Sequence, residues 1–549
     1  MKGAEILVKS LESQGVEVVF GIPGNHNLAL YDELSKSKIK RILATHEPSA
    51  GFMADAYGRV SGEPGVAIVT AGPGILNMVN PVAQAYVESS PMVIIASQCN
   101  SKCYGKGHYH ELDNIDAQIN IFKNITKWQA RAESAAEIPK KISEAFWQAK
   151  SGRKRPVYLE IPENIHSEDA TGHPNFTKIS ITQKVPAKKE IESSLAMIAS
   201  SKSPVIIAGG GVICSNASPE LISFAENLNL PVATTVMGKS SIPSNHPLAL
   251  GCGIGRLGAP AASEIISKSD LMVAVGCRFD EVATGFFTLK VPEKLIIIDI
   301  DEREALKRVS PNLCLNGDAK ATLEALALEA KKIGIIPKNS SIRDDIALLR
   351  ESGRAEMEKR IPLGYPNMPE LLNAIDKLFP KDSILLCDTG NSLLWVSDFP
   401  LNSKQLVAPA GYNSMGFSLP GAIAAKLAKP EKTIAAICGD GSFLMTGMEL
   451  ITAVRYNLDL NVFVIHDGLY NILSIFQDMA FGGRRTDTEI STFDFAKFAD
   501  LVGAKGIRIE KNCDLNSAIK KGLSHKGPVL FDVIVDPALK PFCLGRLNL

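Results

Sequence analysis

Short apolar runs without polar alternation recur along most of this chain, and helix-length amphipathic stretches separate them. Examples are residues 65–70, 91–96, 271–276, 295–299 and 461–465. Strands with both faces covered read as continuous apolar runs, and such strands belong to parallel sheets with helices on both sides. The pattern therefore predicts an α/β fold of doubly wound parallel sheets.

Two polar, proline-containing stretches interrupt this rhythm, at about residues 167–189 and 331–354, and both are typical of linkers. They divide the 549 residues into three predicted α/β domains, residues 1–166, 190–330 and 355–545. Ligands of open parallel sheets lie beyond the carboxyl ends of the strands, so we expect the functional residues there.

Composition excludes several classes of protein. Lys plus Arg and Asp plus Glu both number 59, and this zero net charge argues against a nucleic-acid-binding protein. No segment approaches the ~18 consecutive apolar residues of a membrane span, and the first residues do not resemble a signal peptide. Ten irregularly spaced cysteines predict neither a disulfide framework nor a zinc site. We therefore expect a cytoplasmic protein.

A Gly-Asp-Gly motif follows an apolar run in the third predicted domain. Asp440 lies between Gly439 and Gly441, and Asp467 follows the next apolar run. Neighbouring parallel strands would bring both carboxylates to one sheet edge, where they suit a hard cation such as Mg²⁺. The glycines would let the backbone approach an anion. The alternative interpretation is a turn followed by a helix cap.

The separation of Asp440 and Asp467 by 27 positions resembles the thiamine diphosphate fingerprint. The common version of that fingerprint ends in Asn-Asn, whereas this chain has His466-Asp467. The additional carboxylate is expected to hold the metal more tightly.

Glu47 follows a short strand-like run and begins a helix-like segment in an apolar surround. It can be a first-turn glutamate favoured by the helix dipole. It can also hydrogen-bond a ring nitrogen of thiamine diphosphate and share a proton with it. The aspartate pair favours the second interpretation.

The chain is similar over nearly its whole length to the catalytic subunits of acetolactate synthase (acetohydroxyacid synthase), a group of thiamine diphosphate enzymes. Motifs from all three predicted domains carry the resemblance: Phe20–Gly24, His46-Glu47, Ala71–Gly74 with Asn77, Pro91-Met92, Gly209–Gly211, Thr234–Gly238, Gly276–Asp280, Asp299–Asp301, Gly317-Asp318, Tyr412–Pro420, the aspartate pair, and Phe476–Met479 with Gly483-Arg484. It implies a pyrimidine-binding, a central and a diphosphate-binding domain. The cofactor would lie between the first domain of one subunit and the third of another, which requires a homodimer or homotetramer. Some members have a regulatory subunit, and the sequence leaves its presence here open.

The resemblance also implies roles for individual residues. Glu47 would activate the cofactor, Met415 would wedge it into a bent shape, and Leu469 would add a backbone carbonyl to the metal held by Asp440 and Asp467. The expected cofactor-binding residues are Gly72, Asn77, Thr389, Gly390, Asn391, Ser392, Asn413, Ser414, Met415, Gly439, Gly441 and Ser442. The implied reaction is decarboxylation of a 2-oxo acid such as pyruvate, followed by addition to a second carbonyl compound.

Three positions depart from the family pattern. His26 replaces a small residue and is similar to a histidine of benzaldehyde lyase, which predicts a proton-transfer role; an ordinary buried histidine is the alternative. The loop at 108–118, with His110 and Gln118 as expected substrate-pocket residues, is longer than its counterpart. Phe476 replaces a tryptophan that favours 2-oxobutyrate, so that preference should be weaker.

FAD in the central domain is a further implication, because Gly209–Gly211, Arg278 and Asp299–Asp301 resemble its contacts. Arg278 is alternatively a substrate-pocket residue that contacts an acceptor carboxylate. The family's Gly-Met-His-Gly segment is altered here to Gly255-Arg-Leu-Gly258.

Two other functions stay open. His26 and the longer loop favour a 2-oxo acid decarboxylase or a benzaldehyde lyase-like C–C lyase of the same superfamily. Residues 253–258 match GxGxxG, but only a weak strand precedes them, so a nicotinamide-dependent dehydrogenase is a remote alternative.

Overall fold

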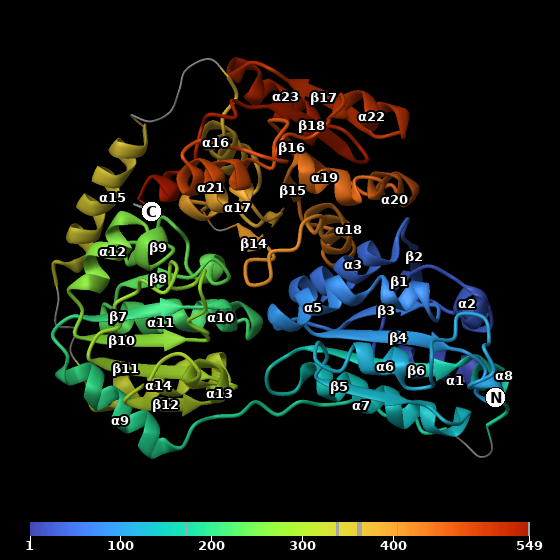
Figure 1. Cartoon of the computed structure of the whole chain (residues 1–549). Coiled ribbons are helices and arrows are strands. Elements are labelled where there is room, and N and C mark those ends of the chain that lie inside the picture. The colour runs from blue at the N-terminus through green and yellow to red at the C-terminus, as the bar shows by residue number, and fades with distance from the viewer. Residues whose placement is uncertain (171–173, 336–339, 359–364, 403, 547–549) are drawn as a thin grey trace.

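Three parallel sheets form the framework of the molecule in the computed structural model, which describes residues 1–170, 174–335, 340–358, 365–402 and 404–546 (Figure 1). Each sheet has six strands, and its strand pairs are parallel. In Figure 1 the domain of the third sheet lies above the domains of the other two. The α/β fold with three parallel-sheet domains is confirmed.

The first sheet has the order β2-β1-β3-β4-β6-β5. Its strands are β1 (Val18–Gly21), β2 (Lys40–Leu43), β3 (Gly65–Val69), β4 (Met92–Gln98), β5 (Trp128–Arg131) and β6 (Pro156–Pro162). Every residue of β3, β4 and β6 is buried, as expected of strands covered on both faces. The helices of this domain are α1 (Gly3–Ser13), α2 (Leu28–Lys36), α3 (Glu47–Ser61), α4 (Pro73–Leu76), α5 (Val79–Val87), α6 (Ala117–Ile121), α7 (Ile138–Lys150) and α8 (Glu163–Ser167).

The central sheet has the order β12-β11-β10-β7-β8-β9. Its strands are β7 (Pro204–Ala208), β8 (Val232–Thr234), β9 (Ala249–Cys252), β10 (Leu271–Val275), β11 (Lys294–Asp299) and β12 (Leu313–Asn316). The helices are α9 (Lys188–Ser200), α10 (Gly210–Cys214), α11 (Ser218–Leu228), α12 (Pro260–Ser267), α13 (Glu302–Leu306) and α14 (Ala319–Ile333).

The third sheet has the order β14-β13-β15-β16-β18-β17. Its strands are β13 (Ile384–Cys387), β14 (Gln405–Val407), β15 (Ile434–Gly439), β16 (Asn461–His466), β17 (Lys505–Ile509) and β18 (Val529–Ile534). The helices are α16 (Met368–Leu378), α17 (Asn391–Asp398), α18 (Ser418–Ala428), α19 (Asp440–Thr446), α20 (Glu449–Arg455), α21 (Asn471–Phe481), α22 (Phe495–Leu501) and α23 (Leu515–Leu523).

The two predicted linkers differ in structure. Residues 174–187 contain neither helix nor strand, whereas helix α15 (Ile342–Glu358) begins in the second linker and continues past its predicted end at residue 354. Residues 171–173 and 336–339 of these linkers lie outside the described residues. The exact domain boundaries stay a prediction.

The first and third domains share one hydrophobic core. Helix α3 packs on α18, and the rings of Phe52 and Phe417 meet edge to face with centroids 6.0 Å apart. Buried Glu449 of α20 accepts hydrogen bonds from the backbone N–H and the hydroxyl of Thr45, at 2.9 and 2.5 Å. These contacts fix the beginning of α3, where Glu47 lies, against the third domain.

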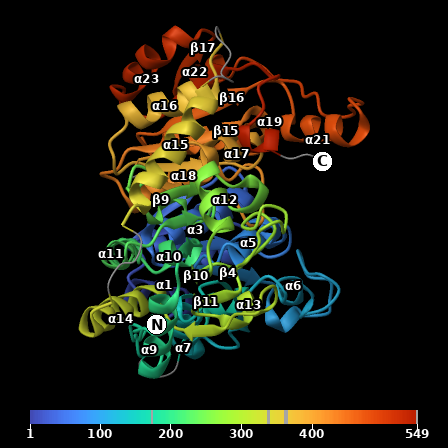
Figure 2. The ribbon, with the colours of Figure 1, turned by 90° about the vertical axis from the view of Figure 1, so that its left-hand side faces the viewer.

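Figure 2 shows the molecule turned by 90°, with α6 and α21 on the same side. Among the described residues, each helix is too short or too polar to cross a lipid bilayer.

Candidate active site

Asp440 and Asp467 lie together at the carboxyl edge of the third sheet. Strands β15 and β16 are parallel neighbours with Gly439 opposite Ile465, so the residues after them meet. Asp440 is buried, and its Oδ2 accepts hydrogen bonds from the backbone N–H of Asp467 (3.2 Å) and of Gly468 (2.7 Å). The structure therefore brings together the two carboxylates that the motif predicts.

Both carboxylates are destabilised in their charged form. Burial raises the pKa of Asp440 and, together with the charge of Asp440, raises that of Asp467 to about 6. A buried and a half-buried acid side by side favour binding of a divalent cation, which would neutralise them. Oxygen donors of this kind fit Mg²⁺.

Asn471 positions Asp467, and the sequence reasoning missed it. Its side-chain amide donates to Asp467 Oδ2 at 2.6 Å and to the carbonyl of Pro537 at 3.0 Å. The i, i+4 spacing in the helix-like segment after Asp467 was the available signal. His466, the departure from the common fingerprint, instead contacts Asp532 and Thr492, each at 2.8 Å.

The backbone beside the aspartates leaves room for another group. A Cβ built on Gly439 would have no heavy atom within 4 Å, and one built on Gly390, which has a φ of 82°, would meet only a methyl of Ile472 at 3.7 Å. Asn391 begins α17, and its buried Oδ1 has no hydrogen-bond partner among the described residues. The unobstructed backbone at Gly439 and Gly390 fits a bound diphosphate, to which the side-chain amide of Asn391 can donate through its N–H₂ group. Ser442 is buried in the first turn of α19.

Asp388 anchors the loop that carries Met415. It follows β13 and is buried, and its carboxylate accepts hydrogen bonds from the backbone N–H groups of Gly416 (2.9 Å), Phe417 (3.2 Å) and Ser418 (3.0 Å). This bonding keeps Met415 half-buried at the turn. Sequence reasoning missed Asp388, which lies directly before the predicted residue Thr389.

Polar contacts connect other predicted cofactor-binding residues. The Thr389 hydroxyl donates to Asn413 Oδ1 at 3.0 Å, and Ser414 donates to Asn80 of the first domain at 3.0 Å. Asn413 has a φ of 61°, a conformation that asparagine tolerates better than most residues.

Glu47 is the first residue of α3. Asn77 donates from its side-chain amide to Glu47 Oε2 at 3.0 Å, so these two predicted residues meet. The expected apolar surround is incomplete, because Glu47 is only half-buried in the single chain. The carboxyl edge of the first sheet stays partly uncovered there.

His26 and the 108–118 loop lie at the same edge of the first sheet. His26 is buried, with Nδ1 3.4 Å from the Thr70 hydroxyl and Nε2 3.1 Å from the carbonyl oxygen of Tyr109. Burial lowers the pKa of His26. The rings of His26 and His110 are 5.3 Å apart, so the structure brings these two predicted residues together.

Gln118 of α6 contacts the Gly72 turn of the first domain. It is buried, accepts a hydrogen bond from Gly72 N–H at 2.9 Å, and donates to Ser97, Tyr158 and Glu160. Its contacts therefore fix the Gly72 turn. Phe476 of α21 is half-buried and packs on the cluster of Ile475, Cys543 and Leu544.

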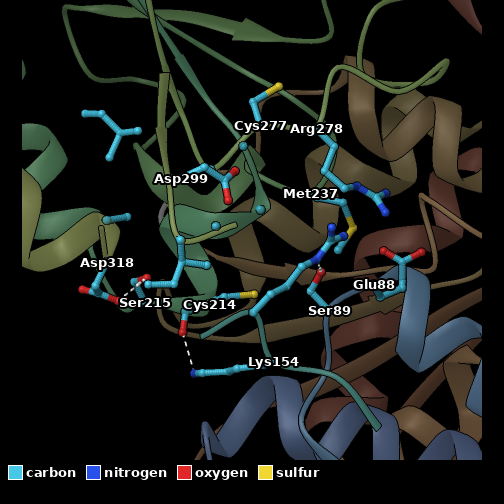
Figure 3. A pocket seen from close by; sticks show the side chains of 18 of the residues that line it. Glu88, Ser89, Lys154, Cys214, Ser215, Met237, Cys277, Arg278, Asp299 and Asp318 are labelled. Carbon is cyan, nitrogen blue, oxygen red and sulfur yellow. Dashed lines mark hydrogen bonds between the residues drawn. The ribbon is translucent and has the colours of Figure 1, made fainter. Parts of the chain in front are cut away.

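Arg278 lies in a different place from His110, Gln118 and Phe476. It lines a cavity of about 510 Å³ between the first and central domains (Figure 3). His110, Gln118 and Phe476 are not among the residues that line this cavity. Its guanidinium donates to the Val87 carbonyl and to Asp280, each at 2.6 Å. In the single chain Arg278 therefore belongs to the central-domain cavity.

The same cavity contains most of the other residues predicted to contact a flavin, but Asp301 is not among those that line it. Gly209–Gly211, Asp299 and Ile300 line it, together with Asp318 and Met237 (Figure 3). Burial raises the pKa of Asp299 to about 6. The cavity volume of about 510 Å³ is in the range of cofactor-binding sites. The altered segment at 255–258 is not among the lining residues.

The GxGxxG match does not have the structure of a dinucleotide fingerprint. It follows the edge strand β9 and leads into a 3₁₀ turn, Gly255–Leu257, before α12 begins at Pro260. A fingerprint glycine loop would open a helix directly.

Comparison with known proteins identifies the class of enzyme. Residues 1–117 match the N-terminal TPP-binding domain of thiamine pyrophosphate enzymes, residues 191–326 match their central domain, and residues 388–533 match their C-terminal TPP-binding domain. Thiamine pyrophosphate is another name for thiamine diphosphate. Fold and site together define a thiamine pyrophosphate enzyme.

Full-length relatives narrow this class. A probable acetolactate synthase large subunit of Methanocaldococcus jannaschii is 34% identical over 98% of this chain and 92% of its own length. The acetolactate synthase large subunit of Buchnera aphidicola subsp. Schizaphis graminum is 32% identical over 98% and 95%. The chloroplastic acetolactate synthase of Arabidopsis thaliana is 32% identical over 97% and 81%. The chain belongs to the acetolactate synthase family of thiamine pyrophosphate enzymes.

Proposed function

We propose that this enzyme decarboxylates a 2-oxo acid such as pyruvate and joins the remaining two-carbon fragment to the carbonyl of a second 2-oxo acid. The observation that carries the proposal is the pair of carboxylates, buried Asp440 and half-buried Asp467, at the carboxyl ends of neighbouring strands in a chain of this family.

Mg²⁺ and the cofactor would occupy the carboxyl edge of the third sheet. Asp440, Asp467 and the carbonyl of Leu469 would hold the metal, and residues 390–392 with Gly439 and Gly441 would surround the diphosphate. Thiamine diphosphate supplies an electron sink that makes loss of carbon dioxide from a 2-oxo acid feasible.

The protein's own residues would orient the cofactor and transfer protons to and from it and the substrate. Glu47, oriented by its 3.0 Å bond from Asn77, would share a proton with the ring nitrogen of the cofactor. Met415, on the loop anchored by Asp388, would support the bent shape. His26 would transfer a proton near the acceptor, with His110 beside it.

The active unit would be a homodimer or a homotetramer. Apolar side chains exposed on and just after α19, the helix that begins at Asp440, support this: Leu444, Met445 and Met448 are 42%, 52% and 53% exposed. The half-exposed Glu47 fits a site that a second subunit completes. Sedimentation velocity tests this proposal, and an active monomer would contradict it. The relatives described as large subunits support a smaller, regulatory partner, which co-purification from the native host would detect.

FAD is the proposed ligand of the 510 Å³ cavity. The support is the convergence of Gly209–Gly211, Arg278 and Asp299 on one space of suitable volume. The purified enzyme should then show a flavin absorbance spectrum after reconstitution with FAD. A spectrum that is lost on gel filtration would contradict the proposal.

Product analysis with pyruvate as sole substrate tests the proposed reaction. Acetolactate as the main product is expected. Acetaldehyde as the main product would favour the second candidate, a decarboxylase, in which His26, buried at the carboxyl edge of the first sheet, would supply the proton.

A further inference from the structure

Three potential metal ligands meet beside the first sheet. His26 follows β1, Cys99 follows β4, and His108 belongs to the long loop before α6. One ligand atom from each lies within 4.8 Å of those of the other two. Their wide separation along the chain explains why cysteine spacing predicted no zinc site.

The three side chains surround one backbone oxygen. His26 Nε2, Cys99 Sγ and His108 Nδ1 lie 3.1, 3.2 and 3.3 Å from the carbonyl oxygen of Tyr109. The Cys99 thiol donates to this oxygen, and each histidine nitrogen donates to it only in the tautomer that carries a proton there. A carbonyl oxygen has two lone pairs, so it does not accept well from all three. Each of the four atoms can instead present a lone pair to a cation, and one cation would satisfy them all.

The surrounding structure holds these atoms in place. His26 and Cys99 are almost fully buried, at 2% and 0% exposure, and His26 Nδ1 faces the Thr70 hydroxyl at 3.4 Å. A ligating histidine commonly has such a polar partner on its second nitrogen. Cys99 N–H donates to Gln98 Oε1 at 2.8 Å, which fixes the backbone there.

Glu111 closes the loop over the group. Its carboxylate accepts hydrogen bonds from the backbone N–H groups of Gly105 (2.6 Å) and His108 (2.9 Å), and this holds the half-buried His108 ring next to the other two side chains. The positive φ of His110, 68°, turns the chain immediately after Tyr109.

We propose that His26, Cys99 and His108 form a zinc site, with the Tyr109 carbonyl or a water as fourth ligand. Two imidazoles and one thiolate suit tetrahedral Zn²⁺, whereas the oxygen donors of the aspartate site suit Mg²⁺. Binding converts the Cys99 thiol into a thiolate ligand and releases its proton to solvent. Because His26 belongs to this group, zinc binding and the proton transfer proposed above for His26 are mutually exclusive roles of one imidazole, whereas Cys99 and His108 have no part in the proposed thiamine chemistry. Zinc binding itself requires no thiamine diphosphate.

Zinc titration of the full chain tests the proposal. Protein dialysed against a chelator is titrated with Zn²⁺ in competition with a chromophoric chelator, for the wild type, Cys99→Ser and His108→Asn. Cys103→Ser, in the same loop but outside the group, and His525→Asn, exposed in the third domain, are the matched controls. We expect one tight equivalent in the wild type and both controls. Both ligand variants should bind at least about 100-fold more weakly, since loss of even an outer partner costs 10–100-fold.

Cobalt gives an independent signature. Co²⁺ bound by a thiolate has a sulfur-to-metal charge-transfer band in the near ultraviolet, which should appear in the wild type and Cys103→Ser and be absent in Cys99→Ser. Circular dichroism establishes that each variant is folded. Equal zinc affinity of wild type and Cys99→Ser, or a cobalt band that persists in Cys99→Ser, would overturn the proposal in favour of a metal-free hydrogen-bonded cluster around Tyr109.

Discussion

The side-chain amide of Asn77 donates a 3.0 Å hydrogen bond to Glu47 Oε2, while Glu47 Oε1 accepts none from the described residues. One oxygen is therefore held by the protein and the other is available. Because α3 begins at Glu47 and packs on α18 of the third domain, the orientation of this carboxylate depends on the interface between the two domains.

Replacing Asp440 by Asn should abolish metal-dependent binding of the cofactor. The substitution removes one of the two charges that neutralise the cation and adds an N–H near it. Wild-type enzyme at a cofactor concentration 100 times its Kd should gain about 2.7 kcal/mol in stability from thiamine diphosphate with Mg²⁺. Asp440→Asn should gain none, as measured by denaturation with and without both ligands.

The control for that measurement is Asp514→Asn, an exposed position elsewhere in the third domain. It should be stabilised like the wild type. A full ligand-dependent gain in Asp440→Asn would place the metal elsewhere.

Replacing Phe476 by Trp should raise the preference for 2-oxobutyrate over pyruvate as acceptor. An apolar pocket distinguishes two acceptors that differ by one methylene by about 1–3 kcal/mol at most. We therefore expect a change of roughly 10-fold in the ratio of the two products. Competition between both acids measures it. Phe481→Trp, exposed on the same helix, should leave the ratio unchanged; an equal shift in both variants would remove Phe476 from the acceptor pocket.

Parallel sheets and the aspartate pair were predictable from sequence, because both depend on local patterns. Apolar runs identify strands such as β3 and β4, and the Gly-Asp-Gly motif at the end of one strand predicts its meeting with Asp467 on the next. Asp388 and Asn471 were missed, since their roles arise from hydrogen bonds to a distant loop or to another side chain.

Tertiary contacts also explain the remaining differences. Arg278 was expected to contact either a flavin or an acceptor carboxylate, and sequence could not distinguish the two; its ion pair with Asp280 directs it into the central-domain cavity. His26, Cys99 and His108 come from three segments whose meeting depends on sheet order and on the loop closed by Glu111. The spacing of these three residues along the sequence therefore does not predict that they meet.

Buried His166 should make the enzyme less stable in acid. Neither ring nitrogen has a hydrogen-bond partner among the described residues, and burial lowers the pKa of His166 to about 4. The unfolded chain, with an ordinary histidine pKa of ~6.5, therefore binds a proton between about pH 6.5 and 4 that the folded chain does not. His166 therefore does not reduce the free energy of unfolding above pH ~6.5. As the pH falls from about 6.5 to 4, this free energy decreases by at most about 3 kcal/mol.

Urea unfolding of the wild type and His166→Leu at pH 7 and pH 5 measures this contribution. The midpoint of the wild type should fall more on acidification than that of the variant. Equal falls in both proteins would show that His166 is protonated in the folded state or exposed to solvent.

Exchange of the C2 proton of bound thiamine diphosphate with deuterium tests the central claim most directly. The wild type with Mg²⁺ should catalyse this exchange, and Glu47→Gln should bind the cofactor but exchange at least about 100-fold more slowly, the usual contribution of a positioned acid–base group. Glu12→Gln, exposed on α1, is the control and should exchange like the wild type. Exchange at the wild-type rate in Glu47→Gln would contradict the role of Glu47 and the site built around it.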